Sequence, residues 1–151
     1  MHTSSHCREM CRQALAGRLG IGERCIFLGR VSRTEALSVM ATGHCLVQPS
    51  LYDATSTVVV EALAYGMPVL CLDHFGMKDA VNSECGVKIP LNRLDQVILD
   101  FAKAIEAFWL DEDHRYAMAI AAQKASLRLT WKQKAEIVND LYNHVLKREI
   151  L

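Results

Sequence analysis

Residues 49–69 carry the sequence PSLYDATSTVVVEALAYGMPV, and this stretch decides the fold. A strand ends at its first two residues, a polar loop follows, and residues 58–65 are typical of a helix. Gly66 suits the left-handed position after a helix, and Pro68 prevents the helix from continuing. A short apolar run at 69–72 is typical of a buried strand. The stretch therefore predicts strand, loop, helix and strand in succession.

The same alternation extends to both sides of this stretch. Further short apolar runs predict buried strands at residues 25–28, 44–48 and 86–89. Helical spacing of apolar residues predicts helices at 6–19, 33–42, 77–83, 94–109, 112–128 and 131–147. Apolar strands that alternate with helices are typical of a parallel sheet covered on both faces. We therefore expect an α/β fold with a Rossmann-like parallel sheet and flanking helices.

Composition narrows the class of protein. The chain has 151 residues, enough for one domain, and 51% of them are hydrophobic. Lys and Arg total 17, and so do Asp and Glu, so the net charge gives no general attraction to nucleic acid. No apolar run is long enough to span a bilayer, and the first residues lack the pattern of a signal peptide. We expect a cytoplasmic protein in which most of the cysteines are small buried hydrophobes.

Three loops are expected to share one edge of the sheet. In open parallel sheets, ligands bind beyond the carboxyl ends of the strands. The loops that follow the predicted strands there are residues 29–33, 49–57 and 73–77. The helix that begins after the second of these loops would present the free N–H groups of residues 56–59 to the crevice. Such a helix start favours anions, phosphates above all.

Two acids accompany this helix start. Glu61 lies about one turn into the helix and Asp53 lies in the loop before it. A carboxylate among apolar residues needs donors, and the hydroxyls of a ribose or hexose are suitable ones. The helix dipole alone also favours an acid in the first turn, by about 0.3–1 kcal/mol, so Glu61 has a purely local explanation as well. Asp53 is explained most simply by an Asx-turn.

The motifs together resemble the donor site of retaining glycosyltransferases with the GT-B fold, the group that includes glycogen synthases. That family has Pro-Ser, an acid, seven residues, a Glu, and then Ala-x-Ala-x-Gly-x-Pro-Val. The matching positions here are Asp53, Glu61, Ala62, Ala64, Gly66, Pro68 and Val69. Residues 25–29 resemble an upstream Phe-Leu-Gly element, and residues 73–79 resemble a following Gly-x-x-Glu loop. The resemblance covers about residues 8–146.

The resemblance implies a chemistry. A sugar would be transferred from a UDP- or GDP-sugar with retention of anomeric configuration and without a metal or other cofactor. Asp53 would face the donor sugar as the catalytic residue, and Glu61 would hold the ribose hydroxyls. The helix start and nearby basic side chains would offset the charge of the departing phosphate.

The resemblance also implies which groups hold the rest of the donor. The diphosphate would be bound by backbone N–H groups at the start of the helix, those of Ser56, Thr57 and Val58, with Thr55 beside them. Arg30 and Val31 would border the base. Apart from the resemblance, the position of His74 and Lys78 after the third predicted strand leaves two interpretations open, contact with the ligand or a purely structural place in the loop.

The sequence departs from the family in its polar loop. Asp53 stands where the family usually has Glu, and Ala54-Thr55-Ser56 stand where it has Gly-Phe-Gly. Because the glycines permit close approach of the backbone, their replacement alters the donor pose and bears on activity.

The chain also lacks segments that the family has. An N-terminal acceptor domain and the first strands of the donor domain are absent. Residues 1–151 are therefore expected to be a partial C-terminal donor-binding domain, inactive by itself. The gap in its sheet would expose a strand edge that invites a domain-swapped homo-oligomer. The complete protein would transfer sugar to a saccharide or lipid-linked saccharide in bacterial polysaccharide or lipopolysaccharide synthesis, at the inner face of the plasma membrane.

Two other functions stay open from the sequence. The altered loop at 54–56 suits a nucleotide- or phosphate-binding α/β module without transferase activity. The neutral charge and apolar composition suit a module that only oligomerises.

Overall fold

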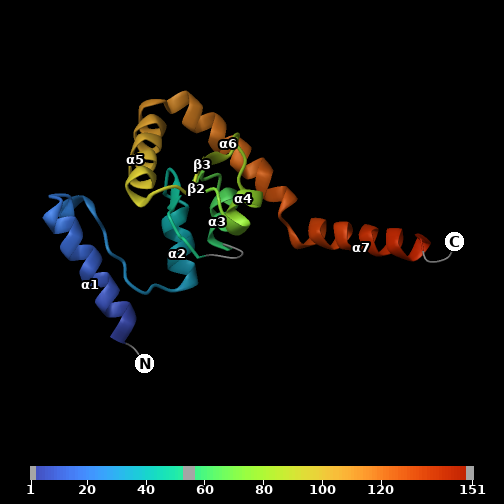
Figure 1. Cartoon of the computed structure of the whole chain (residues 1–151), viewed down its shortest axis with the longest axis horizontal. Coiled ribbons are helices and arrows are strands. Elements are labelled where there is room, and N and C mark those ends of the chain that lie inside the picture. The colour runs from blue at the N-terminus through green and yellow to red at the C-terminus, as the bar shows by residue number, and fades with distance from the viewer. Residues whose placement is uncertain (1–2, 53–56, 149–151) are drawn as a thin grey trace. The chain divides into compact units, whose positions relative to one another are not determined.

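A computed structural model describes residues 3–52 and 57–148 of the chain. It divides into two compact units, Met1–Ala36 and Leu37–Leu151. The boundary between them falls within helix α2, Arg33–Met40. Figure 1 labels the elements in chain order. Each unit is described by itself.

The first unit contains helix α1, Thr3–Arg18, and the short 3-10 helix η1, Gly22–Arg24. Gly20 follows α1 with a φ of +69°, as expected of a glycine at a helix end. Helix α2 begins with a reciprocal pair of hydrogen bonds between Ser32 and Glu35, at 2.8 and 3.2 Å. The hydrogen bonds from Ser32 lower the pKa of Glu35. The predicted helices at 6–19 and 33–42 are thus confirmed.

The predicted strand at residues 25–28 is wrong. This segment forms no strand, and Ile26 is 86% exposed. The apolar run alone cannot make a strand, because its backbone N–H and C=O groups need a paired neighbour. The described residues offer it no such neighbour, since the sheet is built from three other segments.

The described part of the second unit holds a three-stranded parallel sheet with the order β1-β2-β3. The strands are β1, Leu46–Gln48, β2, Val69–Leu72, and β3, Gly86–Ile89. Leu46 pairs with Val69 on one side of the central strand. On the other side Val69 pairs with Gly86. The strand predicted at 44–48 is therefore shorter than expected, and the other two are confirmed.

Helices connect the strands and cover them. Helix α3, Thr57–Ala64, joins β1 to β2, and α4, Phe75–Ala80, joins β2 to β3. Three long helices follow the sheet, α5, Leu94–Leu110, α6, Glu112–Arg128, and α7, Trp131–Arg148. Helix α3 packs against α6, and α5 packs on β2 and β3 (Figure 1). The arrangement is the expected α/β fold.

The core lies around the central strand. All four residues of β2 are completely buried, as apolar strands of a parallel sheet should be. The side chains that fill the core around it come from α3, α4, α5 and α6 and from Val81, which follows α4. Those from the helices include Val59, Leu63, Met77, Val97, Phe101, Phe108, Met118 and Ala122.

The apolar side chains of the long helices differ in burial. On α5, Phe101 and Phe108 are in the core, whereas Trp109 is 69% exposed and its ring lies 5.7 Å from the guanidinium of Arg115. Leu15 of α1 and Leu141 of α7 are also exposed. Periodicity correctly predicts that these residues lie on one face of a helix, but it does not say what covers that face.

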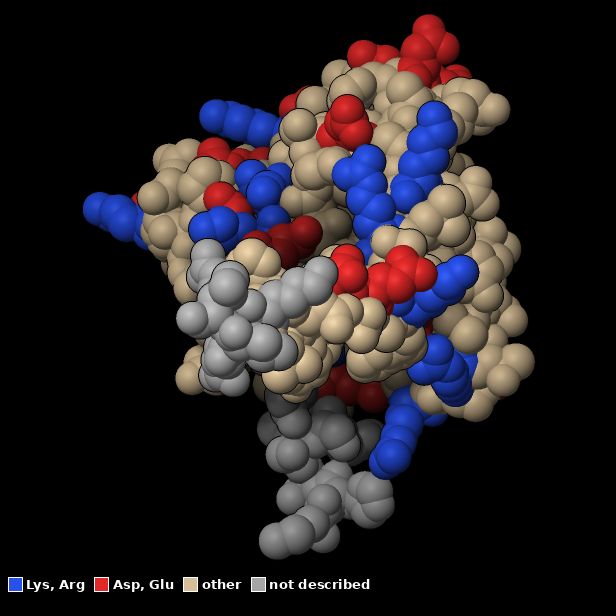
Figure 2. Space-filling model, turned by 90° about the vertical axis from the view of Figure 1, so that its right-hand side faces the viewer, with Lys and Arg blue, Asp and Glu red and all other residues tan. Residues whose placement is uncertain are grey.

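Strand β1 has a neighbour on one side among the described strands. The expected gap in the sheet and oligomerisation through a strand edge stay predictions. Within the described ranges, no helix is long and apolar enough to cross a membrane. Figure 2 shows Lys and Arg intermixed with Asp and Glu on one face, in keeping with a formal charge of +0.

Replacing Gly86 by Ala tests the packing of the sheet. A Cβ at this position would collide with the carbonyl oxygen of Val69 and come within 2.7 Å of Cγ1 of Val81. The carbonyl oxygen of Val69 belongs to the paired strand β2 and cannot move away without disturbing the sheet. We therefore expect Gly86→Ala to lower the free energy of unfolding by about 2–3 kcal/mol. Urea denaturation followed by circular dichroism measures this.

Gly17→Ala is the matched control, because a Cβ there would meet nothing within 4 Å. It should leave stability unchanged or raise it by up to about 1 kcal/mol, since Gly17 lies in helix α1. Equal effects of the two substitutions would contradict the packing described for β2 and β3.

Candidate functional site

The topology brings the ends of β1 and β2 to one edge of the sheet. The two strands are parallel, so their last residues, Gln48 and Leu72, end on the same side. Helix α3 joins these strands and therefore begins at that edge, at Thr57. By helix geometry, its first four N–H groups have no partner within the helix. The edge thus combines two loops with the positive end of a helix.

Three of the predicted donor-binding residues lie on this helix. Thr57 is exposed at its first position, and Val58 is partly buried against the core. Glu61 is half-buried one turn further on, next in sequence to the buried Ala62. The structure therefore brings the predicted phosphate-binding backbone and the predicted ribose-binding carboxylate onto one short helix.

The remaining predicted residues are placed differently. Asp53, Thr55 and Ser56, with Ala54 between them, lie outside the described residues, so their roles stay predictions. Arg30 and Val31 lie in the first unit, where Arg30 is exposed and Val31 is partly buried. Their predicted contact with the base also stays a prediction.

The loop after β2 is held tightly to the sheet. The N–H of Asp73 donates to the carbonyl oxygen of Ile89 at 2.8 Å. The N–H of His74 donates to the carbonyl oxygen of Leu72, also at 2.8 Å. Lys88 of β3 lies 3.8 Å from the Asp73 carboxylate and donates a hydrogen bond of 3.2 Å to the carbonyl oxygen of Lys78. These contacts fix the backbone at the start of α4.

Two aromatic residues at this edge were not singled out from the sequence. The ring of Tyr52, after β1, lies 5.7 Å from the ring of Phe75, after β2. His74, for which the sequence leaves contact with the ligand open, lies 4.1 Å from Phe75 between ring centroids. The available signal was the presence of aromatic residues in two loops that follow neighbouring strands.

Two cysteines of the sheet region, Cys71 in β2 and Cys45 just before β1, are neutral thiols. Burial raises the pKa of Cys71 in β2 to about 11, and the nearby charge of Lys88 offsets part of this rise. Burial also raises the pKa of Cys45. A thiol with a raised pKa is a poor nucleophile at neutral pH. The two residues behave as the small hydrophobes that the sequence predicts.

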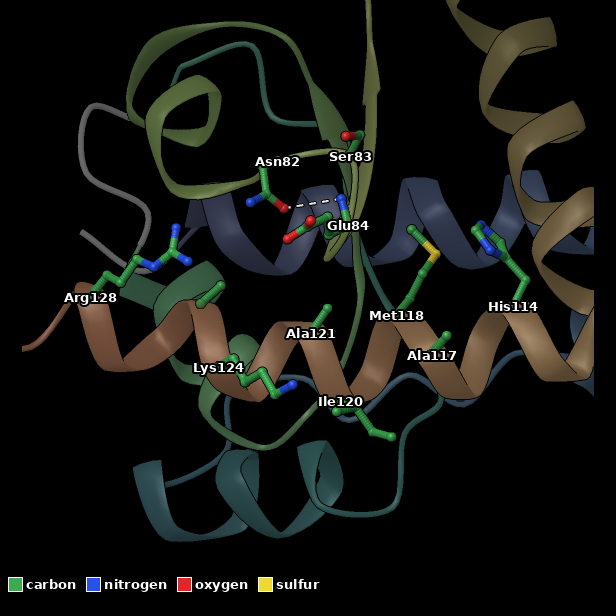
Figure 3. Close-up of a pocket in the computed structure, with 11 residues that line it drawn as sticks. Asn82, Ser83, Glu84, His114, Ala117, Met118, Ile120, Ala121, Lys124 and Arg128 are labelled. Carbon is green, nitrogen blue, oxygen red and sulfur yellow. Dashed lines mark hydrogen bonds between the residues drawn. The ribbon is translucent and has the colours of Figure 1, made fainter.

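A groove of about 500 Å³ lies at the opposite end of the strands. Its wall is the segment Asn82–Glu84, which precedes β3, and its floor is one face of α6 (Figure 3). Met118 and Ala121 line it between Lys124 and His114 (Figure 3). Of the predicted donor-binding residues that the structure describes, none lines this groove. Among the side chains that the structure describes, those of residues 9–52 and 57–146, no group of His, Cys, Asp and Glu is placed to hold a metal ion.

Comparisons with known proteins place these features in context. The sequence model of the family described as "Glycosyl transferases group 1" matches residues 8–125. The chain is 29% identical over 136 residues to the D-inositol 3-phosphate glycosyltransferase of Corynebacterium urealyticum, covering 89% of this chain and 31% of that protein. The protein of the same name from Corynebacterium jeikeium is 31% identical over 134 residues, with 88% and 31% covered. The chain thus spans about a third of the length of these relatives.

A solved structure shows the same fold. The sucrose-phosphate synthase of Thermosynechococcus elongatus superimposes with a TM-score of 0.71, at 24% sequence identity. The match covers 91% of this chain and 34% of that one. The α/β architecture is therefore that of a GT-B protein, as the motif at residues 53–69 predicts.

Substitutions at Phe75 test the backbone geometry of this edge. Phe75 has a φ of +49°, a conformation that costs about 1–2 kcal/mol for a residue with a Cβ. Glycine adopts it freely, at an entropic cost of about 0.5–1 kcal/mol relative to Ala. We therefore expect Phe75→Gly to be more stable than Phe75→Ala by about 0.5–1 kcal/mol, the reverse of the usual order in a helix. Thermal and urea denaturation compare the two variants, and a more stable Ala variant would contradict the strained geometry.

Proposed function

Because the chain belongs to the group 1 glycosyl transferases, we propose that it binds the nucleotide-sugar donor of a retaining glycosyltransferase. The observation that carries the proposal is the placement of Thr57, Val58 and Glu61 on helix α3, which begins at the carboxyl edge of the parallel sheet. A helix start at this edge is suited to a diphosphate. The carboxylate one turn further on is suited to two hydroxyls of a ribose.

Each part of the donor has a proposed partner. The N–H groups of Thr57 and Val58 bind the diphosphate, together with those of Ser56 and the adjacent Thr55. Glu61 accepts hydrogen bonds from the ribose hydroxyls. Asp53 faces the sugar at the reacting carbon. As the bond to the sugar breaks, negative charge grows on the diphosphate, and the positive end of α3 stabilises it.

The base is proposed to lie beside Arg30 and Val31, the residues that follow the segment 25–29. The altered loop Ala54-Thr55-Ser56 changes how closely the backbone approaches the donor. It therefore adjusts the pose of the sugar without removing the helix start that binds the phosphates.

The acceptor and the transfer reaction belong to the complete protein. We propose that the acceptor is held by a second domain, because the chain spans about a third of the relatives that it matches. Without groups that position an acceptor, an enzyme loses an advantage of about 7–11 kcal/mol, so the isolated chain should bind donor without transferring sugar. The relatives are named for D-inositol 3-phosphate rather than for a polysaccharide, so a role in polysaccharide or lipopolysaccharide synthesis stays a prediction without support from them.

Removing the carboxylate of Glu61 tests the proposal. We expect Glu61→Ala to weaken binding of UDP or GDP, whichever the chain binds, by at least about a hundredfold, because two hydrogen bonds to a charged group are lost, each worth about 1.5–3 kcal/mol. Isothermal titration calorimetry measures the affinities. Glu106→Ala removes an exposed carboxylate on α5 and serves as the matched control, with no change expected.

The deoxyribose analogues make this test specific to the ribose. The parent chain should bind UDP or GDP more tightly than its 2′-deoxy form, and Glu61→Ala should bind both forms alike. If the variant keeps the full preference for the ribose form, Glu61 does not hold the hydroxyls and the proposed site is wrong.

A further inference from the structure

The aromatic residues at the carboxyl edge form a surface that the core does not need. The ring planes of Tyr52 and Phe75 are tilted by 48°, and those of His74 and Phe75 by 57°. Tyr52 is 92% exposed and Phe75 is 42% exposed. Rings that contribute to folding stability are normally buried, because their contribution comes from the apolar area removed from water. These rings instead lie side by side with much of their surface in water.

The backbone at this surface is strained. Phe75 is the one non-glycine residue with a positive φ among the residues that the structure describes. A bulky side chain in this region is rare, and strain of this kind is concentrated at ligand sites. The hydrogen bonds of Asp73 and His74 and the contacts of Lys88 hold the strained loop in place.

The position of Tyr52, which follows β1, does not depend on the contacts that hold Phe75 after β2. The hydroxyl of Ser50 accepts a hydrogen bond from the N–H of Tyr52 at 3.4 Å. It lies 3.3 Å from the carbonyl oxygen of Tyr52, to which it donates. Ser50 thus fixes the backbone of Tyr52 while the ring remains exposed. The loops after β1 and β2 therefore bring two rings together at the carboxyl edge of the sheet, where the proposed donor site lies.

We propose that Tyr52 and Phe75 form a stacking surface for the sugar ring of the donor. This inference rests on the proposed function. The diphosphate lies at the start of α3 in that proposal. The loops after β1 and β2 lie at the same edge of the sheet, so they are in place for the sugar that is attached to the diphosphate.

The shape of the aromatic pair favours a sugar over a flat base. A planar base can lie parallel to only one of two rings that are tilted by 48°. A pyranose chair has C–H groups that point in several directions, so it can contact both rings at once. Aromatic faces carry partial negative charge and attract the partly positive hydrogens of such C–H groups. Tyr52 and Phe75 are accordingly specificity-determining residues for the sugar and leave the nucleotide to other groups.

The test compares donors with and without the sugar. Calorimetry gives the affinity of the chain for UDP and UDP-glucose, and for GDP and GDP-mannose. We define the sugar factor as the affinity for the nucleotide sugar divided by the affinity for the corresponding nucleoside diphosphate. It is measured for whichever of the two pairs binds. We expect Tyr52→Ala and Phe75→Gly each to lower the sugar factor about threefold to tenfold, with the diphosphate affinity unchanged within about twofold.

Matched variants separate stacking from other effects. Tyr52→Phe keeps the ring and should keep the sugar factor. Tyr116→Ala removes a 70% exposed ring from α6 and should leave both affinities unchanged. Phe75→Gly introduces a residue that adopts the observed φ freely, so the loop keeps its conformation when the ring is removed.

The inference is overturned if both ring deletions leave the sugar factor unchanged, or if they weaken the diphosphate and the nucleotide sugar equally. The proposed function fails by different results. It is wrong if neither UDP nor GDP binds, or if Glu61→Ala binds the diphosphate as tightly as the parent chain. Should no diphosphate bind, saturation-transfer NMR with methyl glucoside and methyl mannoside decides the inference alone. If saturation passes from the protein to a glycoside and this signal is lost in Tyr52→Ala, the result supports a sugar-stacking surface. If neither glycoside receives saturation, the inference is overturned.

Discussion

The burial of strand β2 between two parallel neighbours is the constraint on which the rest of the second unit depends. Every side chain of β2 is inaccessible to solvent, and both of its edges are paired. Parallel pairing requires the chain to leave each strand at one edge and to return through a crossover. Helix α3 must therefore begin where β1 and β2 end. Because β1 and β2 are parallel, the loops that follow them lie at the same edge of the sheet, and this does not depend on the sequences of the loops.

Local patterns predict the elements around this constraint well. The apolar runs at 69–72 and 86–89 are strands, and the glycine after α3 has the expected positive φ of 71°. The segment 25–28 has an equally apolar sequence and is not a strand, because pairing is supplied by other parts of a chain and not by the run itself. The exposed Trp109 shows the same limit, since a helical pattern does not specify what packs against it.

The candidate site divides in a similar way. Glu61 and the start of α3 were predictable, because a carboxylate one turn into a helix at a strand end is visible in the sequence. The aromatic pair was not predictable, because it depends on the contact between two loops and on a positive φ at Phe75.

The most direct test of the account is to locate nucleotide binding by amide NMR. The chain has two places that suit a nucleotide, the helix start at the carboxyl edge of the sheet and the groove at the opposite end of the strands. On titration with UDP or GDP, the account predicts that the amide signals of Thr57 and Val58 shift and that those of Asn82 to Glu84 do not. Shifts centred on the groove, with Thr57 and Val58 unmoved, would contradict it.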